Sequence, residues 1–293
     1  MRALNSVLNT FRRSGKVSVG LTLVVLIVLV GLLHNQIVDL IGRGQFTTPL
    51  DLGYGPRFQL PSHHFLLGTD NQGRDELAMV VTGLWTSLQV GAEAGVISTV
   101  IGVIVAFYAA YRGGVLDSIL STTTDLFLVI PSLPLLIAFT GFAKNTSITE
   151  IAIILAVFGW AGAARVIRSH VLSLRTRTYV DLARVSKESP LEIVLTELMP
   201  NMLPYLALGL SYAIIGAIFA LVGLEVIGLG PSGVVDLGFL LNDALGDGAM
   251  TLGVWPDFVA PIFLIVLLFF ALNMINLGLE EVFNPRLRKV VGG

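Results

Sequence analysis

The chain has 293 residues, of which 54% are hydrophobic and 13% charged, about half the charged share of an average soluble domain. Its mean hydropathy of +0.83 excludes an ordinary soluble protein, because so much apolar surface could not be buried in a domain of this length. The net charge of −2 gives no reason to expect a nucleic-acid partner, and the absence of cysteine excludes disulfides and thiolate metal sites.

The first apolar stretch, residues 17–33, follows Arg12, Arg13 and Lys16. A signal peptide has the same order of charge and apolar residues. This stretch is longer than a signal-peptide core, however, and no small-residue cleavage site follows it. We therefore expect a first membrane span that is retained.

Six segments match the length of about 20 apolar residues that a helix needs to cross a bilayer. They are residues 17–38, 88–111, 126–143, 148–164, 202–224 and 258–279. Arg165 limits the fourth, and Pro131 and Pro134 predict a kink in the third. The expected fold is all-α, with six transmembrane helices.

The expected domain organisation follows from these spans. Residues 1–16 form an N-terminal segment, 17–87 the first span with a long outer loop, 88–285 the transmembrane core, and 286–293 a tail. We expect a surface helix at 75–84 in the outer loop, and a polar helical loop at 165–201 inside the core.

Lysine and arginine in the connections predict the orientation, since they concentrate on the cytoplasmic side. If both termini are cytoplasmic, 14 of the 18 fall on that side and 4 outside. The inner set is Arg2, Arg12, Arg13, Lys16, Arg112, Arg165, Arg168, Arg175, Arg177, Arg184, Lys187, Arg286, Arg288 and Lys289, and the outer set is Arg43, Arg57, Arg74 and Lys144.

The inner loop predicts two short helices. In the first, Tyr179, Leu182, Ala183 and Ser186 share one face by helical spacing, and the helix is expected to end near Lys187. In the sequence Ser189-Pro190-Leu191-Glu192, Ser189 and Glu192 predict a capping box with proline at the first helical position.

The second helix places Leu191, Val194, Leu195 and Leu198 on one side and is expected to stop at Pro200. Such a helical pair on a membrane bundle indicates a docking element for another protein. The alternative is an amphipathic hairpin lying on the lipid surface.

The same residues resemble the EAA loop of permeases from binding-protein-dependent ABC importers. Asp181-Leu182-Ala183 stands at E-A-A, Lys187 at the following Gly, and Glu197-Leu198-Met199-Pro200 at I-x-L-P. Ala183 and Pro200 keep the family identity. The resemblance implies that coupling to an ATPase involves Tyr179, Asp181, Leu182, Ala183, Arg184, Ser186, Lys187, Ser189 and Pro200.

Further motifs are similar to one branch, the "C"-type dipeptide and oligopeptide permeases. Leu67-Gly68-Thr69-Asp70 with Gly73-Arg74-Asp75 matches their L-G-T-D-x-x-G-R-D before the second span. Other matches are Gly159-Trp160 with Ala164-Arg165 and Arg168, Pro200-Asn201, Gly228-Leu229-Gly230, and Pro285-Arg286-Leu287-Arg288. The chain departs from the branch at Glu225, where the family has Ser, and at Leu237, where it has Trp.

The resemblance implies a transport subunit that hydrolyses nothing itself and needs no cofactor. Its implied partners are a second homologous permease in a heterodimer, two cytoplasmic ATPase subunits and an extracytoplasmic solute-binding protein. Its implied place is the prokaryotic plasma membrane. Di- or oligopeptides are the implied solutes, and related systems carry nickel or oligosaccharides. The rival class is an ion-coupled secondary transporter that uses Glu93 or Asp125 as proton carrier.

Intramembrane acids are expected to be functional or to pair between helices. Glu93, Asp125 and Glu225 are therefore candidates for the translocation path, with Glu225 expected at the outer mouth.

Three other patterns point to no site. Gly68 and Gly73 have P-loop spacing but precede Arg74-Asp75 instead of Lys-Ser/Thr, and Asp70 and Asp75 would repel phosphate. His63-His64 has no third ligand nearby, and no histidine follows Ser211 as a nucleophile would need. We expect no metal site and no catalytic residue.

Overall fold

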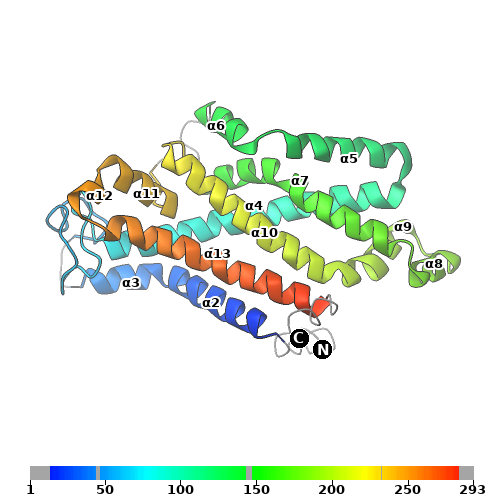
Figure 1. Cartoon of the computed structure of the whole chain (residues 1–293), viewed down its shortest axis with the longest axis horizontal. Coiled ribbons are helices and arrows are strands. Elements are labelled where there is room, and N and C mark those ends of the chain that lie inside the picture. Colours follow the sequence, from blue (N-terminus) through cyan, green and yellow to red (C-terminus); the bar gives the residue numbers. More distant parts are fainter. Residues whose placement is uncertain (1–13, 44–46, 143–146, 232, 284–293) are drawn as a thin grey trace, which may run out of the picture. The chain divides into compact units, whose positions relative to one another are not determined.

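The computed structural model describes residues 14–43, 47–142, 147–231 and 233–283. The N-terminal residues before Ser14, the C-terminal tail and the Pro285–Arg288 motif lie outside this description. Within it the chain is helical, with one isolated β-bridge between Thr69 and Asp75 (Figure 1). The helices are α2 (Gly15–Leu32), α3 (His34–Ile41), α4 (Glu76–Arg112), α5 (Gly114–Val129), α6 (Ser132–Phe142), α7 (Ile148–Leu174), α8 (Thr178–Val185), α9 (Pro190–Glu192), the π-helix η1 (Ile193–Leu198), α10 (Met199–Val226), α11 (Leu237–Gly246), α12 (Ala249–Leu252) and α13 (Pro256–Phe283).

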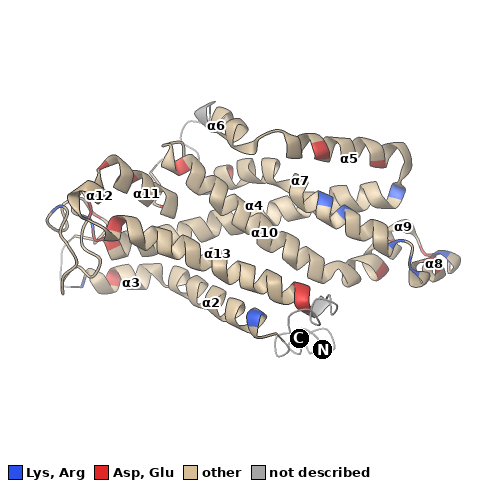
Figure 2. Ribbon diagram, viewed as in Figure 1, with Lys and Arg blue, Asp and Glu red and all other residues tan. Residues whose placement is uncertain are grey.

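Five of the described helical stretches are long and apolar enough to cross a membrane, and a sixth span results if α5 and α6 are taken together. Charged residues are sparse along these helices, and α13, for example, carries acids only near its two ends (Figure 2). Six spans were expected, and the kink expected in the third is a bend of 82° between α5 and α6. Pro131 lies in this break, where the chain cannot continue the α5 hydrogen bonds.

Several predicted boundaries are wrong. The third span begins at Gly114 instead of residue 126, and the surface helix expected at 75–84 is the first part of α4, which continues unbroken to Arg112. The first span is interrupted at Leu33, between α2 and α3. The fourth helix continues past Arg165 to Leu174.

The second hairpin helix does not stop at Pro200, because α10 runs through it. The π-helix η1 lies immediately before α10, so Pro200 falls in the first turn of the α-helical part. The helical stretch runs without a break from Pro190 to Val226, so the missing N–H of Pro200 falls inside it, directly after the π turn where the regular hydrogen-bond pattern is already interrupted. Sequence reasoning had no signal for this local widening.

The described residues fall into two compact units. One comprises the residues up to Val90, Thr140–Ile151 and the residues from Ile218 onward; the other comprises Gly91–Phe139 and Ala152–Ala217.

In the first unit, α2 and α13 lie side by side in opposite directions (Figure 1). Gly20 and Gly278 allow close approach, since a Cβ at Gly20 would lie 2.6 Å from the Ala271 carbonyl oxygen, and one at Gly278 would lie 2.7 Å from the Val17 backbone nitrogen. An ion pair between Lys16 and Glu281 joins the ends of the two helices. Small residues at such contacts suit membrane helices, where packing, not the hydrophobic effect, drives association.

Candidate functional site

The α8–α9 hairpin, residues 178–198, contains the turn that the sequence predicted near Lys187. Helix α8 ends with Lys187 in the left-handed region at φ +61°. The Glu188 N–H donates to the Ala183 carbonyl (3.2 Å) and the Lys187 N–H to the Arg184 carbonyl (3.0 Å). This is a Schellman motif, which usually has Gly at the left-handed position. Lys187 therefore adopts the conformation that explains the family's preference for Gly there.

The second half of the turn is the capping box. The Ser189 hydroxyl accepts from the Glu192 N–H (3.2 Å), and the Glu192 carboxylate accepts from the Ser189 N–H (3.3 Å). Pro190 occupies the first helical position, as predicted. The prediction of a helix restart at this point is confirmed, and together the two motifs fix the direction in which the chain turns.

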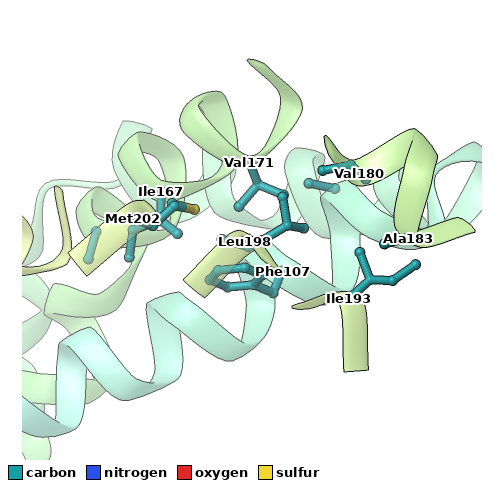
Figure 3. Packing of buried hydrophobic residues seen from close by; sticks show 11 residues of the cluster. Phe107, Ile167, Val171, Val180, Ala183, Ile193, Leu198 and Met202 are labelled. Atoms are coloured by element: carbon teal, nitrogen blue, oxygen red, sulfur yellow. The ribbon is translucent and has the colours of Figure 1, made fainter. Parts of the chain in front are cut away.

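The hairpin is anchored by an apolar cluster in the second unit. Val180 and Ala183 of α8, with Ile193 and Leu198 of η1, pack among side chains from α4, α7 and α10 (Figure 3). The remaining buried members are Ala106, Phe107, Ala110, Ala163, Ile167, Val171 and Met202. The hairpin therefore packs as part of this unit and does not hang from it as a loose loop.

The other side of the hairpin exposes large apolar side chains. Leu182 and Val185 of α8 are 63% and 81% exposed, and Leu191 and Leu195 are 67% and 51% exposed. The sequence had placed Leu182 and Ala183 on one face, whereas the structure buries Ala183 and leaves Leu182 in the open. These exposed apolar side chains lie on a segment that also carries the charged residues Asp181, Arg184 and Lys187.

A second candidate site is the Gly68–Asp75 motif. Asp70 Oδ1 accepts from the Gln72 and Arg74 N–H groups (2.8 and 2.9 Å), and the Arg74 guanidinium pairs with Asp70 (2.5 Å) and with Asp243 of α11 (2.8 Å). Burial raises the pKa of Asp243, and Arg74 offsets part of that rise. The Asp75 carboxylate accepts from the Ala78 N–H at the start of α4 (2.9 Å).

The glycines of this motif serve close packing, not phosphate binding. Gly68 and Gly73 both have positive φ, and a Cβ at either would overlap a carbonyl oxygen, of Gln59 or Gly55 respectively. The backbone N–H groups of Gly68, Thr69, Asp70 and Gly73 already donate to carbonyls within the loop. A P-loop needs such groups free for phosphate, so this segment is a structural loop tied to α11.

The candidate path acids lie in different surroundings. Asp125 of α5 pairs with Arg165 of α7 (2.5 Å), and both side chains are more than half exposed in this chain. Asp117 forms two hydrogen bonds with Arg168 (2.7 Å each), so two ion pairs join α5 to α7. Glu93 of α4 is half-buried.

Glu225, the acid expected at the outer mouth, is buried within the chain. Its side chain is 4% exposed and lies against the Asp236 carboxyl group, which is fully buried. Sequence reasoning missed Asp236. The residue precedes α11 and caps it, with Asp236 Oδ1 accepting from the Gly238 and Phe239 N–H groups (2.6 and 3.0 Å).

No group of three or more His, Cys, Asp or Glu side chains within the described ranges is arranged to hold a metal ion. His63 and His64 are exposed loop residues, and Ser211 donates to the Ala207 carbonyl of its own helix (3.0 Å).

Residues 98–289 match the family of binding-protein-dependent transport system inner membrane components. The chain belongs to this family. It is 32% identical over 247 residues to the oligopeptide transport system permease protein OppC of Mycobacterium tuberculosis, covering 83% of each chain. It is also 31% identical over 230 residues to the dipeptide transport system permease protein DppC of Bacillus subtilis, covering 78% of this chain and 71% of DppC.

A solved structure of the MetNI methionine ABC transporter, in an inward-facing conformation, has a chain that shares the fold of this permease. The TM-score is 0.57 at 21% identity, over 69% of this chain and 97% of the other. The permease is therefore an all-α inner-membrane subunit of an ABC importer, as the sequence predicted, and its relatives are transport subunits.

Proposed function

We propose that this permease carries di- or oligopeptides and is driven by separate ATPase subunits that dock on the α8–α9 hairpin. The observation that carries the coupling proposal is the contrast between the two sides of the hairpin. One side is packed into the cluster with Phe107, Ile167 and Met202, while Leu182, Val185, Leu191 and Leu195 remain exposed. The peptide class rests on the relatives named above.

The physical basis of coupling is that the hairpin and the membrane helices share one core. A partner that pushes on Leu182 or Val185 acts on α8, whose Val180 and Ala183 pack with side chains of α4, α7 and α10. Close-packed interiors transmit displacement instead of absorbing it. The Schellman turn and the capping box add hydrogen bonds that stiffen the hairpin against a push from the partner.

The proposed assembly contains a second homologous permease, two ATPase subunits and an extracytoplasmic solute-binding protein. Both termini and the 165–201 loop are proposed to be cytoplasmic, on the strength of the lysine and arginine asymmetry. The domain division 1–16, 17–87, 88–285 and 286–293 follows from that topology.

For the translocation path, the exposure of the Asp125–Arg165 pair supports a place beside water or a partner subunit, because an ion pair is costly against lipid. Glu93, half-buried on α4, is the second proposed path residue. The burial of Glu225 gives no support to a place for this residue on the path.

Docking is tested by charge placed on the exposed side of the hairpin. Leu182→Glu should weaken capture of the ATPase subunits from solubilised membranes by about tenfold or more, since a central interface residue contributes about 2 kcal/mol. Peptide uptake should fall with it. Thr196→Glu is the matched control, because Thr196 is also exposed on the hairpin but polar. Unchanged capture in Leu182→Glu would favour a hairpin that lies on lipid.

Topology is tested by single cysteines, which report cleanly in a chain with none of its own. His64→Cys should react with an impermeant thiol reagent in intact cells, and Ser173→Cys only after the membrane is opened. Reaction of Ser173→Cys from outside would reverse the proposed orientation. Uptake of labelled peptides, with oligosaccharide and nickel as competitors, then tests the solute class.

A further inference from the structure

The end of α10 and the start of α11 meet at two carboxyl groups. Glu225 lies in the last turn of α10, and Asp236 is the N-cap of α11. The two carboxyl groups lie against each other, and both residues are buried, at 4% and 0% exposure. Glu225 Oε1 and Asp236 Oδ2 have no hydrogen-bond partner in the described part of the chain.

Backbone packs closely around this pair on several sides. A Cβ on Gly230 would overlap the Glu225 carboxyl group, so the Gly228–Gly230 turn closes directly over it. A Cβ on Gly238 would lie 2.7 Å from Glu225 Cβ and 2.9 Å from Val222 Cα, so α10 and α11 are in backbone contact. On the α4 side, a Cβ on Gly83 would lie 3.0 Å from the Asp236 carbonyl carbon, and Ser87 Oγ accepts from the Leu237 N–H (3.0 Å).

No cation balances the pair within the described residues. The charged groups that act on Glu225 and Asp236 are each other alone. On the neighbouring elements, Asp243 of α11 interacts with Arg74, Asp247 and Asp70. Glu76 of α4 interacts with Arg74 and with acids of that second group, and Asp257 of α13 interacts with Asp70, Asp243 and Asp247. Two ionised carboxylates in contact would repel strongly at this depth.

We propose that Glu225 and Asp236 form a proton-binding site, in which one shared proton holds the N-terminus of α11 against the end of α10. One carboxyl donates through this proton, and the other accepts as a carboxylate. The remaining negative charge is stabilised by the Gly238 and Phe239 N–H groups at the positive end of α11. When the proton passes to bulk water, the two carboxylates repel and α11 separates from α10.

The sign of the pH dependence follows from the buried cap. Burial raises the pKa of Asp236 above its ordinary value, although the Phe239 and Gly238 N–H groups oppose this rise. A raised carboxyl pKa means that the folded contact binds the proton more tightly than the separated groups do. The contact is therefore intact at low pH and is lost as pH rises through the folded value.

Infrared spectroscopy of the permease, purified with its partner subunits in lipid nanodiscs, tests the shared proton. Glu225→Gln and Asp236→Asn each replace one carboxyl with an amide that can donate to the other, and Asn keeps the helix cap. We expect each variant to lose one protonated-carboxyl C=O band relative to the parent at neutral pH. Loss of a band in only one variant would show that the proton belongs to that residue alone. Loss in neither variant would show that the pair carries no proton, and either result overturns the proposal.

Cysteine labelling tests the release of α11. Leu240→Cys is buried on α11 and Leu245→Cys is half exposed, so the ratio of their labelling rates cancels the pH dependence of thiol chemistry. This ratio should rise by about tenfold per pH unit in the range where the closed contact still holds the proton and the open one has released it, and should level off above that range. In the Glu225→Gln background it should stay constant with pH. A constant ratio in the parent, or the same rise in Glu225→Gln, would overturn the proposal.

Discussion

The chain leaves a helix in the same way at two places, at the end of α8 and at the end of α10. At α10, the Leu229 N–H donates to the Leu224 carbonyl (2.9 Å) and the Gly228 N–H to the Glu225 carbonyl (2.7 Å), with Gly228 at φ +76°. At α8 the same two bonds form around Lys187 at φ +61°. The turn after α10 has glycine, which adopts a positive φ without steric cost, whereas the turn after α8 has a lysine in the same conformation.

The two turns differ in the residues that come directly after them. After Lys187, the capping box of Ser189 and Glu192 supplies further hydrogen bonds, and the turn itself is exposed. After Gly228, the chain packs directly against the Glu225 carboxyl group, and position 230 has room only for a glycine. The comparison teaches that an exposed turn tolerates backbone strain if a cap compensates, whereas a turn over a buried group is restricted by space as well.

The largest effect is expected for Ala183→Glu in the α8–α9 hairpin. Ala183 packs with Val180 and Ile193, so a glutamate would bury an unpaired charge, at a cost of about 3–5 kcal/mol. Hydrogen exchange of α8 should show lost protection, and ATPase capture should fall because the hairpin is displaced. Leu182→Glu, one residue away but exposed, should keep normal exchange. Equal protection in both variants would contradict the packed hairpin.

Gly230→Ala is expected to have the next largest effect. Its methyl group would occupy the space of the Glu225 carboxyl, and overpacking of this kind costs about 1–3 kcal/mol. Chemical unfolding in detergent measures the loss. In a Glu225→Ser background the carboxyl is absent, so the same substitution should cost much less. Gly246→Ala, where a Cβ meets nothing within 4 Å, is the control. An equal cost in both backgrounds would argue against crowding by Glu225.

Gly228→Ala separates backbone strain from crowding. A Cβ at Gly228 would meet nothing within 4 Å, so only the left-handed conformation opposes alanine, at about 1–2 kcal/mol. The cost, measured by the same unfolding assay, should be independent of whether Glu225 or Ser occupies position 225. Dependence on position 225 would show that the two glycines act through one contact.

Lys187→Gly should have the smallest effect and the opposite sign. It removes the left-handed strain of a lysine and should stabilise the hairpin by about 0.5–1 kcal/mol, because glycine adopts positive φ without steric cost. Slower hydrogen exchange at Glu188 and Ser189 is the measurement. Faster exchange would mean that the lysine side chain itself supports the turn.

Local patterns predicted much of the fold. The capping box at Ser189, the bend at Pro131 and the apolar spans each depend on a few neighbouring residues, and each is present. The left-handed Lys187 was not predicted as such, because only the family's Gly, absent here, marks that conformation in a sequence. The length of α4 was misjudged although no proline or glycine run separates the expected surface helix from the span, so the sequence did hold the signal for one continuous helix.

Contacts between distant residues could not be predicted. Nothing in the sequence showed that Asp236 would meet Glu225, or that Arg74 would pair with Asp243, because these contacts depend on where α11 returns to the bundle. Helical spacing placed Leu182 and Ala183 on one broad face, but the cluster from α4, α7 and α10 decides which of the two is buried. The candidate residues were thus found by motif, while their surroundings came from tertiary packing.

The pairing of α2 with α13 constrains the order in which the chain can complete its fold during synthesis. Lys16 and Glu281 are separated by 265 positions, so the ribosome, at about 5–20 residues per second, delivers the partner on the order of tens of seconds after α2 has entered the bilayer. Through that interval α2 lacks α13 and has an earlier neighbour only at Gly31, where a Cβ would lie 3.1 Å from Trp85 and Leu88 of α4; its mean hydropathy of 2.3 suits a helix that faces lipid in the meantime. The close contacts at Gly20 and Gly278 can form only after α13 has been synthesised, so the pairing of α2 with α13 is a late step in folding.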